Sequence, residues 1–550
     1  MLTLVPYIII ALTGVVFLAH YSHKSYDIPR VALLVLSTLL WPLIYLYGIS
    51  VIYLPLGVFY LLGALFGWWI LVALLSSHTH MALERMLALC SGAILCIFLP
   101  PEGFEIGIMM LVIAALLNCI YAIVQNKLRY EPLKHSSNQS HHYAIGFLGN
   151  TNMLGTYLVP HIFLSLWLGY NCHPAWTLSI GPILYTLYLT HCRTAILGLT
   201  ITVLYLLFTI FSIQFTSILI LSSILITYIF VICGITKVLP QLKALGPIKE
   251  RINYWRVALE QIKHTPIFGL GFNVFQTRVP FLQRDINERT NGSFLDFKNY
   301  KCPYPQKCHS DLLQHILDGG LVGFGLICFF IYLTLSPVIS DISTHMFPLT
   351  LALISLLACG LAFHTFHIIP TNILFWFLSF SLIRLSYGGA TEITSSTPFI
   401  VFFIIYLILA LRFTLKELMY DLHLQKYFIN GKTSPPLKAL EWKPDSSEAH
   451  CFAAEYYYHK GNIPKIFEHS MHSLINYDGA QRYWELCSNT ALSFLLSGAL
   501  TLAEQHYHRA LSFWPEYKGA QNGLKQLEEI TKRIKTGTVI GVKHEPKTAS

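Results

Sequence analysis

The sequence predicts an all-α, polytopic membrane protein that ends in a soluble helical domain. Hydrophobic residues make up 54% of the 550 residues and charged residues only 12%, and the mean hydropathy is +0.54. Soluble domains carry about twice that share of charge. Apolar windows of about 20 residues, long enough to cross a bilayer, recur along the chain. The apolar pattern gives way to a soluble helical pattern at residue 437.

The membrane part divides into two groups of predicted spans, within residues 1–236 and 316–420. Apolar windows lie near 3–20, 31–48, 51–75, 82–99, 106–126, 153–170, 174–191, 194–211, 216–236, 312–335, 347–366, 370–386 and 398–415. These windows predict about 12–13 transmembrane helices. The first run has no small-residue cleavage site, so we expect it to be retained and not removed as a signal peptide.

A long polar loop, residues 237–315, separates the two groups of spans. Its first part predicts an amphipathic helix, because apolar residues recur there at helical spacing: Ile252, Trp255, Leu259 and Ile262. Pro266 is expected to end that helix, and Gly269 and Gly271 to form a tight turn. The chain is expected to re-enter the membrane just after His309. A loop of this length between spans is either functional or a linker, and its content favours function.

The C-terminal segment, residues 437–535, predicts helical hairpins. One hairpin is expected over 449–475 with a turn at 460–462, a second lies around 491–511, and 518–535 closes the unit. The order of small residues, Gly turn, Ala, aromatic and Pro resembles tetratricopeptide repeats, which stack into concave binding surfaces. A plain helical domain is the alternative. Residues 536–550 are expected to be disordered.

Two polar pieces lie where the chain enters spans in the first half. The segment 146–155 carries glycines together with Asn150 and Asn152, which offer amide hydrogen bonds to a ligand. The alternative is a helix start capped by asparagine. Arg193 follows Cys192 between two apolar runs, where an ionisable group is either a functional candidate or a snorkelling side chain.

Two further pieces lie in the large loop. Arg251 and Arg256 are candidates for a fork that binds phosphate oxygens, since guanidinium groups bind them bidentately. The alternative is an interfacial helix with basic side chains. His309 lies at the start of a span, where an imidazole can take a proton from a hydroxyl near neutral pH. Asp311 and Gln314 are candidates for supporting roles, whereas Asp318 is expected to lie too far into the following helix.

Taken in order, these pieces resemble the bacterial O-antigen ligase superfamily, which includes protein O-oligosaccharyltransferases. They are Gly149-Asn-Thr-Asn152, Arg193-Thr194, Arg251 with Trp255 and Pro266-x-x-Gly269-x-Gly271, and His309 with Gln314 and Gly320-Leu-Val-Gly323. The resemblance covers residues 140–335, and the remaining spans match only in hydropathy. Cys192 and Ser310 depart from the Ser and Asn common in the family, although both remain small and polar.

The resemblance implies a GT-C-like membrane fold and an inverting glycosyltransferase that needs no metal and no other cofactor. The donor would be a glycan on undecaprenyl diphosphate and the acceptor a hydroxyl group of lipid A-core or of an exported protein. It gives His309 the role of base, and Arg193 and Arg251 that of the diphosphate clamp. The absence of an acidic pair near His309 argues against a two-carboxylate hydrolase mechanism.

Two observations disagree on which side of the membrane the large loop lies. Most Lys and Arg between spans share a side with the loop, so the positive-inside rule alone would place the loop in the cytoplasm. The resemblance implies a bacterial inner-membrane protein with a periplasmic loop, which we adopt. An oxidising compartment would allow Cys302 and Cys308 to close a small disulfide. The net charge of +9 suits contact with anionic lipid or phosphate, although ordinary helix-flanking residues also explain it.

Other functions remain open at this stage. An O-antigen polymerase is the alternative within the same class. A transporter or flippase with an interaction tail would show broken helices in two related halves, and an inactive scaffold would tolerate loss of His309. The helical tail favours a protein partner, and no feature of the sequence indicates a nucleic-acid partner.

Overall fold

The computed structural model describes residues 5–15, 51–52, 54–97, 99, 103–128, 144–210, 246–291, 307–339, 346–387, 391–392, 397–430, 434–479 and 481–536. The predicted spans near 31–48 and 216–236 lie outside the described residues, as do Cys302 and most of the C-terminal tail. The pairing of Cys302 with Cys308 therefore stays a prediction.

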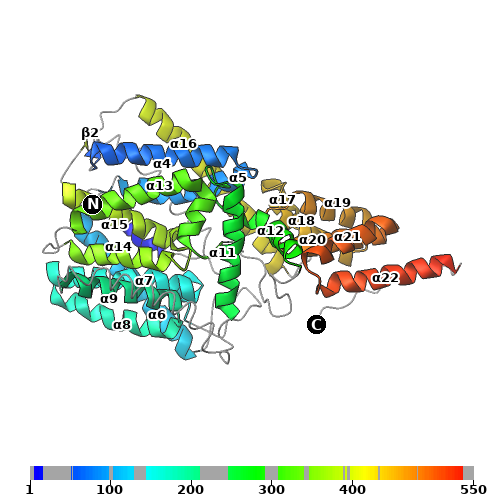
Figure 1. Cartoon of the computed structure of the whole chain (residues 1–550), viewed down its shortest axis with the longest axis horizontal. Coiled ribbons are helices and arrows are strands. Elements are labelled where there is room, and N and C mark those ends of the chain that lie inside the picture. The colour runs from blue at the N-terminus through cyan, green and yellow to red at the C-terminus, as the bar shows by residue number, and fades with distance from the viewer. Residues whose placement is uncertain are drawn as a thin grey trace.

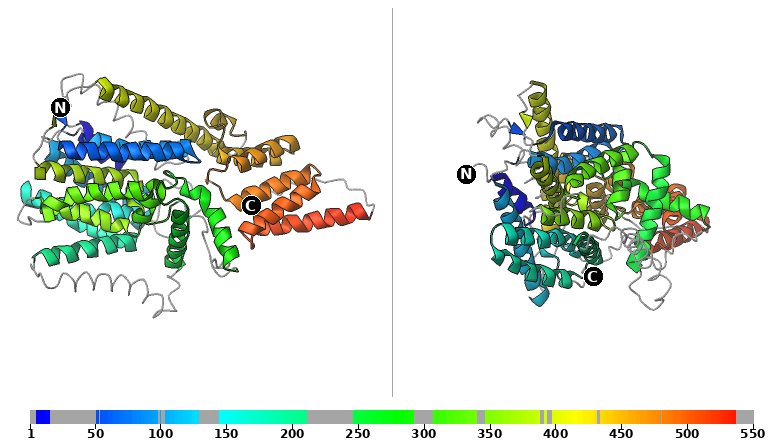
Figure 2. Two further views of the ribbon diagram at one scale, coloured as in Figure 1. Left: turned by 45° about the horizontal axis from the view of Figure 1, so that its top comes forward. Right: turned by 60° about the vertical axis from the view of Figure 1, so that its left-hand side comes forward.

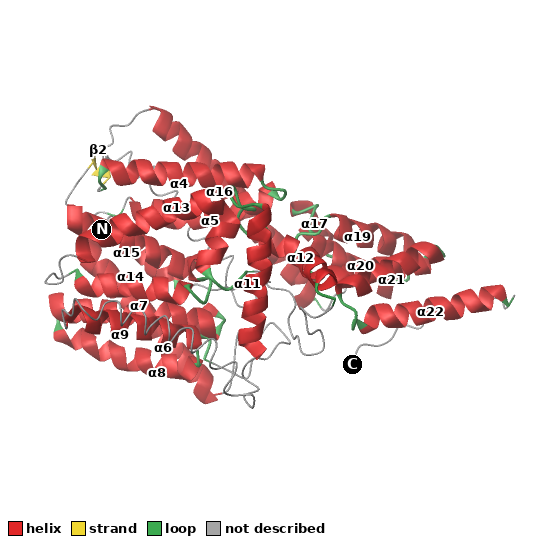
Figure 3. Ribbon diagram, in the orientation of Figure 1, coloured by secondary structure: helices red, strands yellow, loops and turns green. Residues whose placement is uncertain are grey.

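Long apolar helices form the larger part of the molecule, which confirms an all-α polytopic membrane protein (Figures 1 and 3). In the described ranges, six helices are long and apolar enough to cross a membrane: α4 (Leu56–Leu75), α5 (Thr79–Ile97), α6 (Phe104–Leu128), α7 (Thr151–Asn171), α13 (Asp311–Ile339) and α15 (Ile369–Tyr387). Shorter or less regular apolar helices join them: α1 (Val5–Thr13), α8 (Ile180–Thr190), α9 (Arg193–Ile210), α14 (Phe347–Gly360) and α16 (Thr397–Ile429).

The remaining elements of this part are short. They are the 3-10 turns η3 (Gly146–Leu148), η4 (Pro174–Ser179) and η6 (Thr365–His367), and a two-residue antiparallel pairing of β1 (Val51–Ile52) with β2 (Thr391–Glu392). Helix α14 packs between α7 and α9, α13 packs on α4, and α15 packs on α5. The bundle core holds large, fully buried side chains: Trp69, Trp376, Phe330, Phe377 and Phe380.

Small residues set the closest helix contacts in the bundle. A Cβ atom added at Gly155 of α7 would lie 2.6 Å from the Cβ atom of Cys192, beside α9. One added to Gly198 of α9 would overlap the sulfur of Cys359 on α14. Without a hydrophobic drive between helices in lipid, such close backbone approach supplies the packing energy. These contacts bring the N-terminal end of α9 and the C-terminal end of α14 together.

Two predicted spans differ from the observed helices. The span near 347–366 ends as helix α14 at Gly360, because residues 361–368 leave the helix and bond other parts of the site described below. The span near 174–191 is divided into η4 and the 11-residue α8. Hydropathy cannot detect either change, since it reports apolar length and not backbone hydrogen bonding.

The large loop begins with α11 (Gly246–His264), which lies across one end of the bundle, and continues into α12 (Phe275–Arg289) (Figures 1 and 2). The predicted amphipathic helix and its end before Pro266 are confirmed. The buried residues are Tyr254, Val257, Ala258 and Gln261, whereas Leu259 is 49% exposed. An apolar side chain at a bilayer surface can face lipid, so apolar spacing alone does not identify the protein-facing side.

The C-terminal helices lie at the same end of the bundle as α11 (Figures 1 and 2). They are α17 (Leu437–Trp442), α18 (Ser447–His459), α19 (Ile463–Ile475), α20 (Tyr483–Leu496), α21 (Leu500–Phe513) and α22 (Lys518–Lys535). Consecutive helices pack as α18 with α19 and α20 with α21, and α22 covers both α20 and α21. The assignment to tetratricopeptide repeats stays a prediction.

Phe281 of α12 completes the core of this C-terminal unit. Its ring lies 4.8 Å from that of Tyr483 and 5.4 Å from that of Phe513, measured between centroids. The guanidinium of Arg284 lies 4.8 Å from the Phe513 ring centroid, and Gln276 donates to the backbone oxygen of Asp478 at 3.1 Å. The large loop and the C-terminal helices therefore share one face of the membrane part.

Candidate functional site

The candidate site is built around a break in helix α13 at Gly320, where φ is 66° and ψ is −174°. The break frees carbonyl groups of the preceding turn from their helical partners. The backbone N–H of Leu270 donates to the oxygen of Leu317 at 2.6 Å, and that of Gly271 donates to Asp318 at 3.0 Å. These bonds satisfy buried polar groups that would otherwise destabilise the fold.

The Pro266-x-x-Gly269-x-Gly271 motif supplies the segment that docks into this break. The Pro266 oxygen accepts a hydrogen bond from Leu321 N at 2.8 Å. A Cβ atom at Gly269 would lie 2.6 Å from the Gly320 nitrogen, and one at Gly320 would overlap the Ile267 carbonyl oxygen. Both glycines also have positive φ, which other residues rarely adopt. The motif therefore fixes the start of α13 and the loop end that precedes it.

His309 lies two residues before α13, with a left-handed φ of 57°. Strained backbone of this kind costs about 1–3 kcal/mol and is common at functional sites. The imidazole is enclosed by three rings: Tyr254 stacks on it at 5.7 Å, Phe363 lies at 5.8 Å and His364 at 5.0 Å between centroids. Burial, with a smaller effect of the Arg251 charge, lowers the pKa of His309 to about 4. The ring is therefore neutral at pH 7 and able to accept a proton.

Arg251 connects His309 to Arg193. Its Nη1 donates to the Ala362 oxygen at 3.1 Å and to Thr194 Oγ1 at 3.4 Å. Burial lowers the pKa of Arg251, and the charge of Arg193 acts in the same direction. Arg193, the exposed first residue of α9, immediately precedes Thr194. The structure thus brings Arg193, Arg251 and His309 to one place at the end of the bundle.

Arg256 lies elsewhere on α11. Five residues along a helix correspond to a rotation of about 140°, and Arg256 is exposed whereas Arg251 is partly buried. The two arginines therefore do not form the predicted fork on one face of the helix. The cation that shares the surroundings of Arg251 is Arg193, which comes from a distant part of the chain.

The Gly146–Asn152 segment is held by helix α6. Gln125 accepts from the backbone N–H of Ile145 and Gly146 at 3.3 and 3.0 Å, and Asn118 accepts from Phe147 N at 3.0 Å. Buried amides of α6 therefore shape this turn, which leads directly into α7.

Asn150 and Asn152 take different positions at the start of α7. Asn150 is its N-cap and accepts from the backbone N–H of Asn152 at 2.8 Å, which is the alternative considered from the sequence. Asn152 contacts the residue before Arg193 through its backbone oxygen, which accepts a hydrogen bond from Cys192 Sγ at 3.8 Å.

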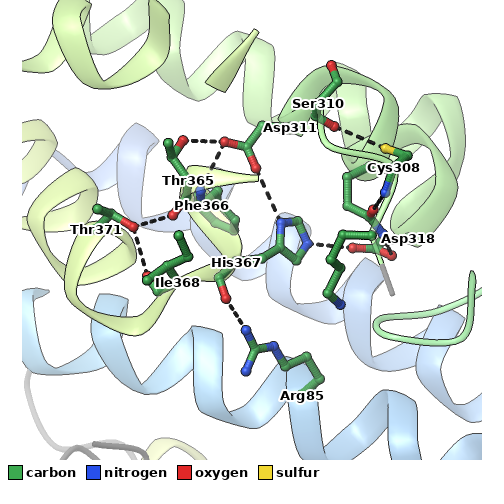
Figure 4. Close-up of polar contacts among 12 residues, drawn as sticks. Arg85, Cys308, Ser310, Asp311, Asp318, Thr365, Phe366, His367, Ile368 and Thr371 are labelled. Carbon is green, nitrogen blue, oxygen red and sulfur yellow. Dashed lines mark hydrogen bonds and ion pairs between the residues drawn. The ribbon is translucent and has the colours of Figure 1, made fainter. Parts of the chain in front are cut away.

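A buried network ties α13 to the loop between α14 and α15 (Figure 4). Asp311 accepts from the hydroxyl of Thr365 and, at 2.9 Å, from the backbone N–H of Phe366. The imidazole of His367 lies between two carboxylates, 3.3 Å from Asp311 Oδ1 and 2.6 Å from Asp318 Oδ2. A neutral imidazole carries one N–H, so it can donate to only one of these two carboxylates.

Gln314 extends the network to the turn that carries His309. Its Nε2 donates to Asp318 Oδ1 at 2.9 Å, and its Oε1 accepts from the backbone N–H of Cys308 at 3.0 Å. The guanidinium of Arg85 donates to the His367 backbone oxygen. Asp311 and Gln314 thus lie where they position His309, and Asp318 belongs to the same network although it was set aside from the sequence.

Sequence reasoning missed the second wall of the site, which His364 and His367 form with Phe363. The run Phe363-His-Thr-Phe-His367 places two imidazoles at a span boundary. This is the same signal that drew attention to His309. Within the described ranges, no three His, Cys, Asp or Glu side chains are grouped as ligands for a metal ion.

An apolar cavity of about 250 Å³ adjoins the network. Asp311, His315 and Thr365 belong to its lining, and the rest of its wall comes from α13, α14, α15 and the loop between α14 and α15: Leu312, Phe324, Ile327, Cys328, Ile331, Leu356, Leu357, Gly360, Leu361, Phe366, Thr371 and Phe375. The cavity can hold an apolar chain whose polar end lies near the site.

The fold and the site define a multi-pass membrane protein with a buried, cation-flanked imidazole at one end of its bundle. Residues 178–328 match the family model described as O-Antigen ligase. This match supports the resemblance to the O-antigen ligase superfamily found in the sequence. Glycan transfer in O-antigen or related glycoconjugate biosynthesis, by a membrane glycosyltransferase-like enzyme, is the function class that this match supports. No curated protein matches the chain.

Proposed function

We propose that this protein transfers a glycan from undecaprenyl diphosphate to a hydroxyl acceptor at the periplasmic face of the bacterial inner membrane. The observation that carries the proposal is the meeting of His309 with Arg251 and Arg193. The three residues come from different parts of the chain. Arg251 donates to Thr194, the residue after Arg193, and to the oxygen of Ala362, the residue before Phe363, whose ring packs against His309.

The reaction needs a base and a cationic clamp. His309 takes the proton from the acceptor hydroxyl, whose oxygen then forms a bond to the anomeric carbon of the sugar. The bond from that carbon to the phosphate oxygen breaks, and its electron pair remains on the diphosphate. Arg251 and Arg193 neutralise the charge that develops there, which is most effective at a water-poor boundary. Attack opposite the leaving group inverts the anomeric centre, and the cations are supplied by protein side chains.

The apolar cavity supports a polyprenyl carrier as donor. Its wall is mostly apolar side chains of the bundle, and its lining includes Asp311 and Thr365, the latter in the loop that contacts Arg251 through Ala362. A carrier chain inside it would leave its diphosphate at the end of the bundle where the arginines lie. Membrane lipid of similar chain length would fit the same wall.

The break in α13 does not support the transporter alternative. Transporters use broken helices to leave carbonyl groups open for an ion. Here the freed carbonyls of Leu317 and Asp318 accept from backbone N–H groups, and that of Gly319 accepts from Trp68 Nε1 at 2.7 Å. The break is therefore filled by protein and serves to shape the site.

The acceptor is assigned as lipid A-core or a Ser/Thr hydroxyl of an exported protein. The C-terminal helices stand at the same end as the site, which favours a protein acceptor or partner. In a polymerase reaction, the acceptor is another lipid-linked repeat unit. Identifying the transfer product distinguishes this reaction from transfer to lipid A-core or to a protein.

Transfer from a purified lipid-linked glycan to candidate acceptors tests the proposal, with the full chain in lipid vesicles. We expect His309→Ala and Arg251→Ala to lower the transfer rate by about 100-fold or more, as loss of a base or an oxyanion donor does elsewhere. Arg289→Ala is the matched control, because this exposed loop arginine pairs with Glu260 at 2.8 Å, away from His309. Normal transfer by both site variants would refute the assignment.

A further inference from the structure

The loop between α14 and α15 is bonded at nearly every residue except at the ring of His364. The Ala362 oxygen accepts from Arg251, the Phe363 oxygen accepts from Asp311 N at 3.1 Å, and the side chains of Thr365 and His367 bond Asp311. The Nδ1 atom of His364, by contrast, is buried with no hydrogen-bond partner among the described residues.

His309 has the same deficiency, and its ring lies edge-on to that of His364. The Nδ1 atom of His309 is also buried without a partner in the described part of the chain. The ring centroids of His309 and His364 lie 5.0 Å apart with the planes at 69°. Each buried polar atom without a partner costs about 1–3 kcal/mol, so two such nitrogens on adjacent rings call for a physical reason.

A second histidine pair in the same protein shows what this separation allows. The rings of His450 and His469 lie 5.1 Å apart between centroids, and their Nδ1 atoms lie 2.9 Å apart, within hydrogen-bond distance. The His309 and His364 rings are at an equivalent centroid separation, so their distance is compatible with a hydrogen bond between the two Nδ1 atoms.

We propose that His364 is the positioning residue of His309, accepting a hydrogen bond from its Nδ1–H. This inference rests on the proposed role of His309 as base. The bond would fix the tautomer of His309 that carries the hydrogen on Nδ1 and leaves the lone pair of Nε2 for the acceptor hydroxyl. A base oriented by a third group is the usual arrangement in nucleophilic and acid–base catalysis.

A carboxylate commonly orients a catalytic imidazole, but the nearest one here is already occupied. Both oxygens of Asp311 are engaged, by Thr365, Phe366 and His367. An imidazole acceptor also adds no negative charge beside the diphosphate clamp. Several charged and titratable groups surround the pair. Arg251 and Tyr254 come from α11 and Arg85 from α5. Lys307 and Asp311 lie two residues from His309 in the chain, and His367 lies in the same loop as His364.

The pairing is tested without any assay of transfer. Diethylpyrocarbonate modifies neutral imidazole, so the pH dependence of His309 modification, followed by mass spectrometry in the full chain, reports its protonation. We expect His364→Asp to raise the midpoint pH for His309 by one unit or more, because an adjacent carboxylate stabilises the cationic ring. His508→Asp, on the exposed side of α21, is the control and should leave the midpoint unchanged. An unchanged midpoint in a His364→Asp chain that melts normally would overturn the proposal.

Nitrogen NMR of the wild-type chain gives a second measurement of the His309 tautomer. It does not depend on whether the His364→Asp variant folds. With ¹⁵N-labelled histidine and the His309 signal assigned by its loss in His309→Ala, we expect His309 to be protonated on Nδ1 at pH 7.5. Protonation on Nε2 would rule out the proposed pairing.

Transfer kinetics then separate this inference from the proposed function. We expect His364→Ala to lower kcat by about 10–100-fold, the usual effect of removing an orienting partner, with little change in KM, and His364→Asp to move the acidic limb of the kcat profile upward. If the midpoint pH of His309 modification shifts in His364→Asp while His309→Ala transfers normally, the pairing of His309 with His364 is supported and the proposed function is refuted. If the midpoint does not shift, the inference on His364 fails whatever the kinetics show.

Discussion

The protein contains two histidine pairs of nearly equal ring separation in very different surroundings. In the C-terminal domain, His450 bonds His469 through Nδ1 and the Pro444 oxygen through Nε2, at 2.9 and 2.8 Å. At the end of the membrane bundle, His309 and His364 are as close, but their Nδ1 atoms lack partners among the described residues. The first pair joins helices α18 and α19 by a hydrogen bond. In the second pair, the Nδ1 atom of each ring makes no hydrogen bond to the described residues. Unsatisfied nitrogen atoms, more than proximity, distinguish the candidate site from a structural contact.

The largest expected difference between the pairs is in transfer activity. We expect His309→Gln to lower the transfer rate by about 10²–10⁴-fold, the range for loss of a general base. His450→Gln should leave the rate within about twofold, since that ring is committed to structural bonds. Initial rates with lipid-linked donor in vesicles provide the measurement. An equal loss of transfer rate in both variants would contradict the functional distinction between the two histidine pairs.

The second prediction asks whether the two regions form one folded unit. Phe281→Ala removes a ring that packs on Tyr483 and Phe513. We expect α12 and α21 to lose at most about 3 kcal/mol of protection, the lower end of the range for a fully buried Phe, because Phe281 is only partly buried. Hydrogen exchange of the intact chain measures this protection, and Leu502→Ala, 43% exposed on α21, is the control. If α12 alone loses protection, the two regions are independent.

The third prediction concerns the bonded pair itself. His469→Ala leaves the Nδ1 of His450 without its partner in a buried position. We expect a loss of about 1–2 kcal/mol in the local stability of α18 and α19, with His508→Ala as the exposed control. Unchanged exchange rates across both helices would show that the contact contributes nothing to stability.

The smallest effect is a pH dependence confined to the C-terminal pair. Burial and the nearby His450 lower the pKa of His469 to about 4, and burial also lowers the pKa of His450. The unfolded chain takes up protons near pH 6.5 while the folded domain stays neutral, so stability falls as the pH drops from about 6.5 toward 4. The melting temperature at pH 7.5 and 5.0 should differ more for the wild type than for a His450→Gln, His469→Gln variant. Equal differences would contradict this.

The sequence predicted much of the fold because hydropathy and helix-ending residues act locally. The all-α class, the helix that ends before Pro266 and the re-entry after His309 agree with the structure. The residues that α11 buries do not follow from its apolar spacing, since at a bilayer surface either protein or lipid can cover an apolar side chain. The early end of α14 was missed because it depends on hydrogen bonds to Asp311 and Arg251, which are far away in the chain.

The candidate site could be predicted only where its residues carry a recognisable pattern. Arg193, Arg251 and His309 were singled out, and the structure brings them together. His364 and His367 were not, because their significance comes from what they face across the bundle. Asp318 was set aside on its distance along α13, yet the turn of the helix directs it to His367 at 2.6 Å.

The packing of Phe281 into the C-terminal helices has a consequence for how the chain is made. Helix α12 is synthesised long before Tyr483 and Phe513, so it waits for nearly the whole remaining chain before its apolar face is covered. The last hundred residues must also be delivered to the same side of the bilayer as the loop. Maturation of the loop is thereby coupled to complete synthesis and correct insertion, and a truncated or wrongly inserted chain would present an exposed Phe281 to the cell's proteases.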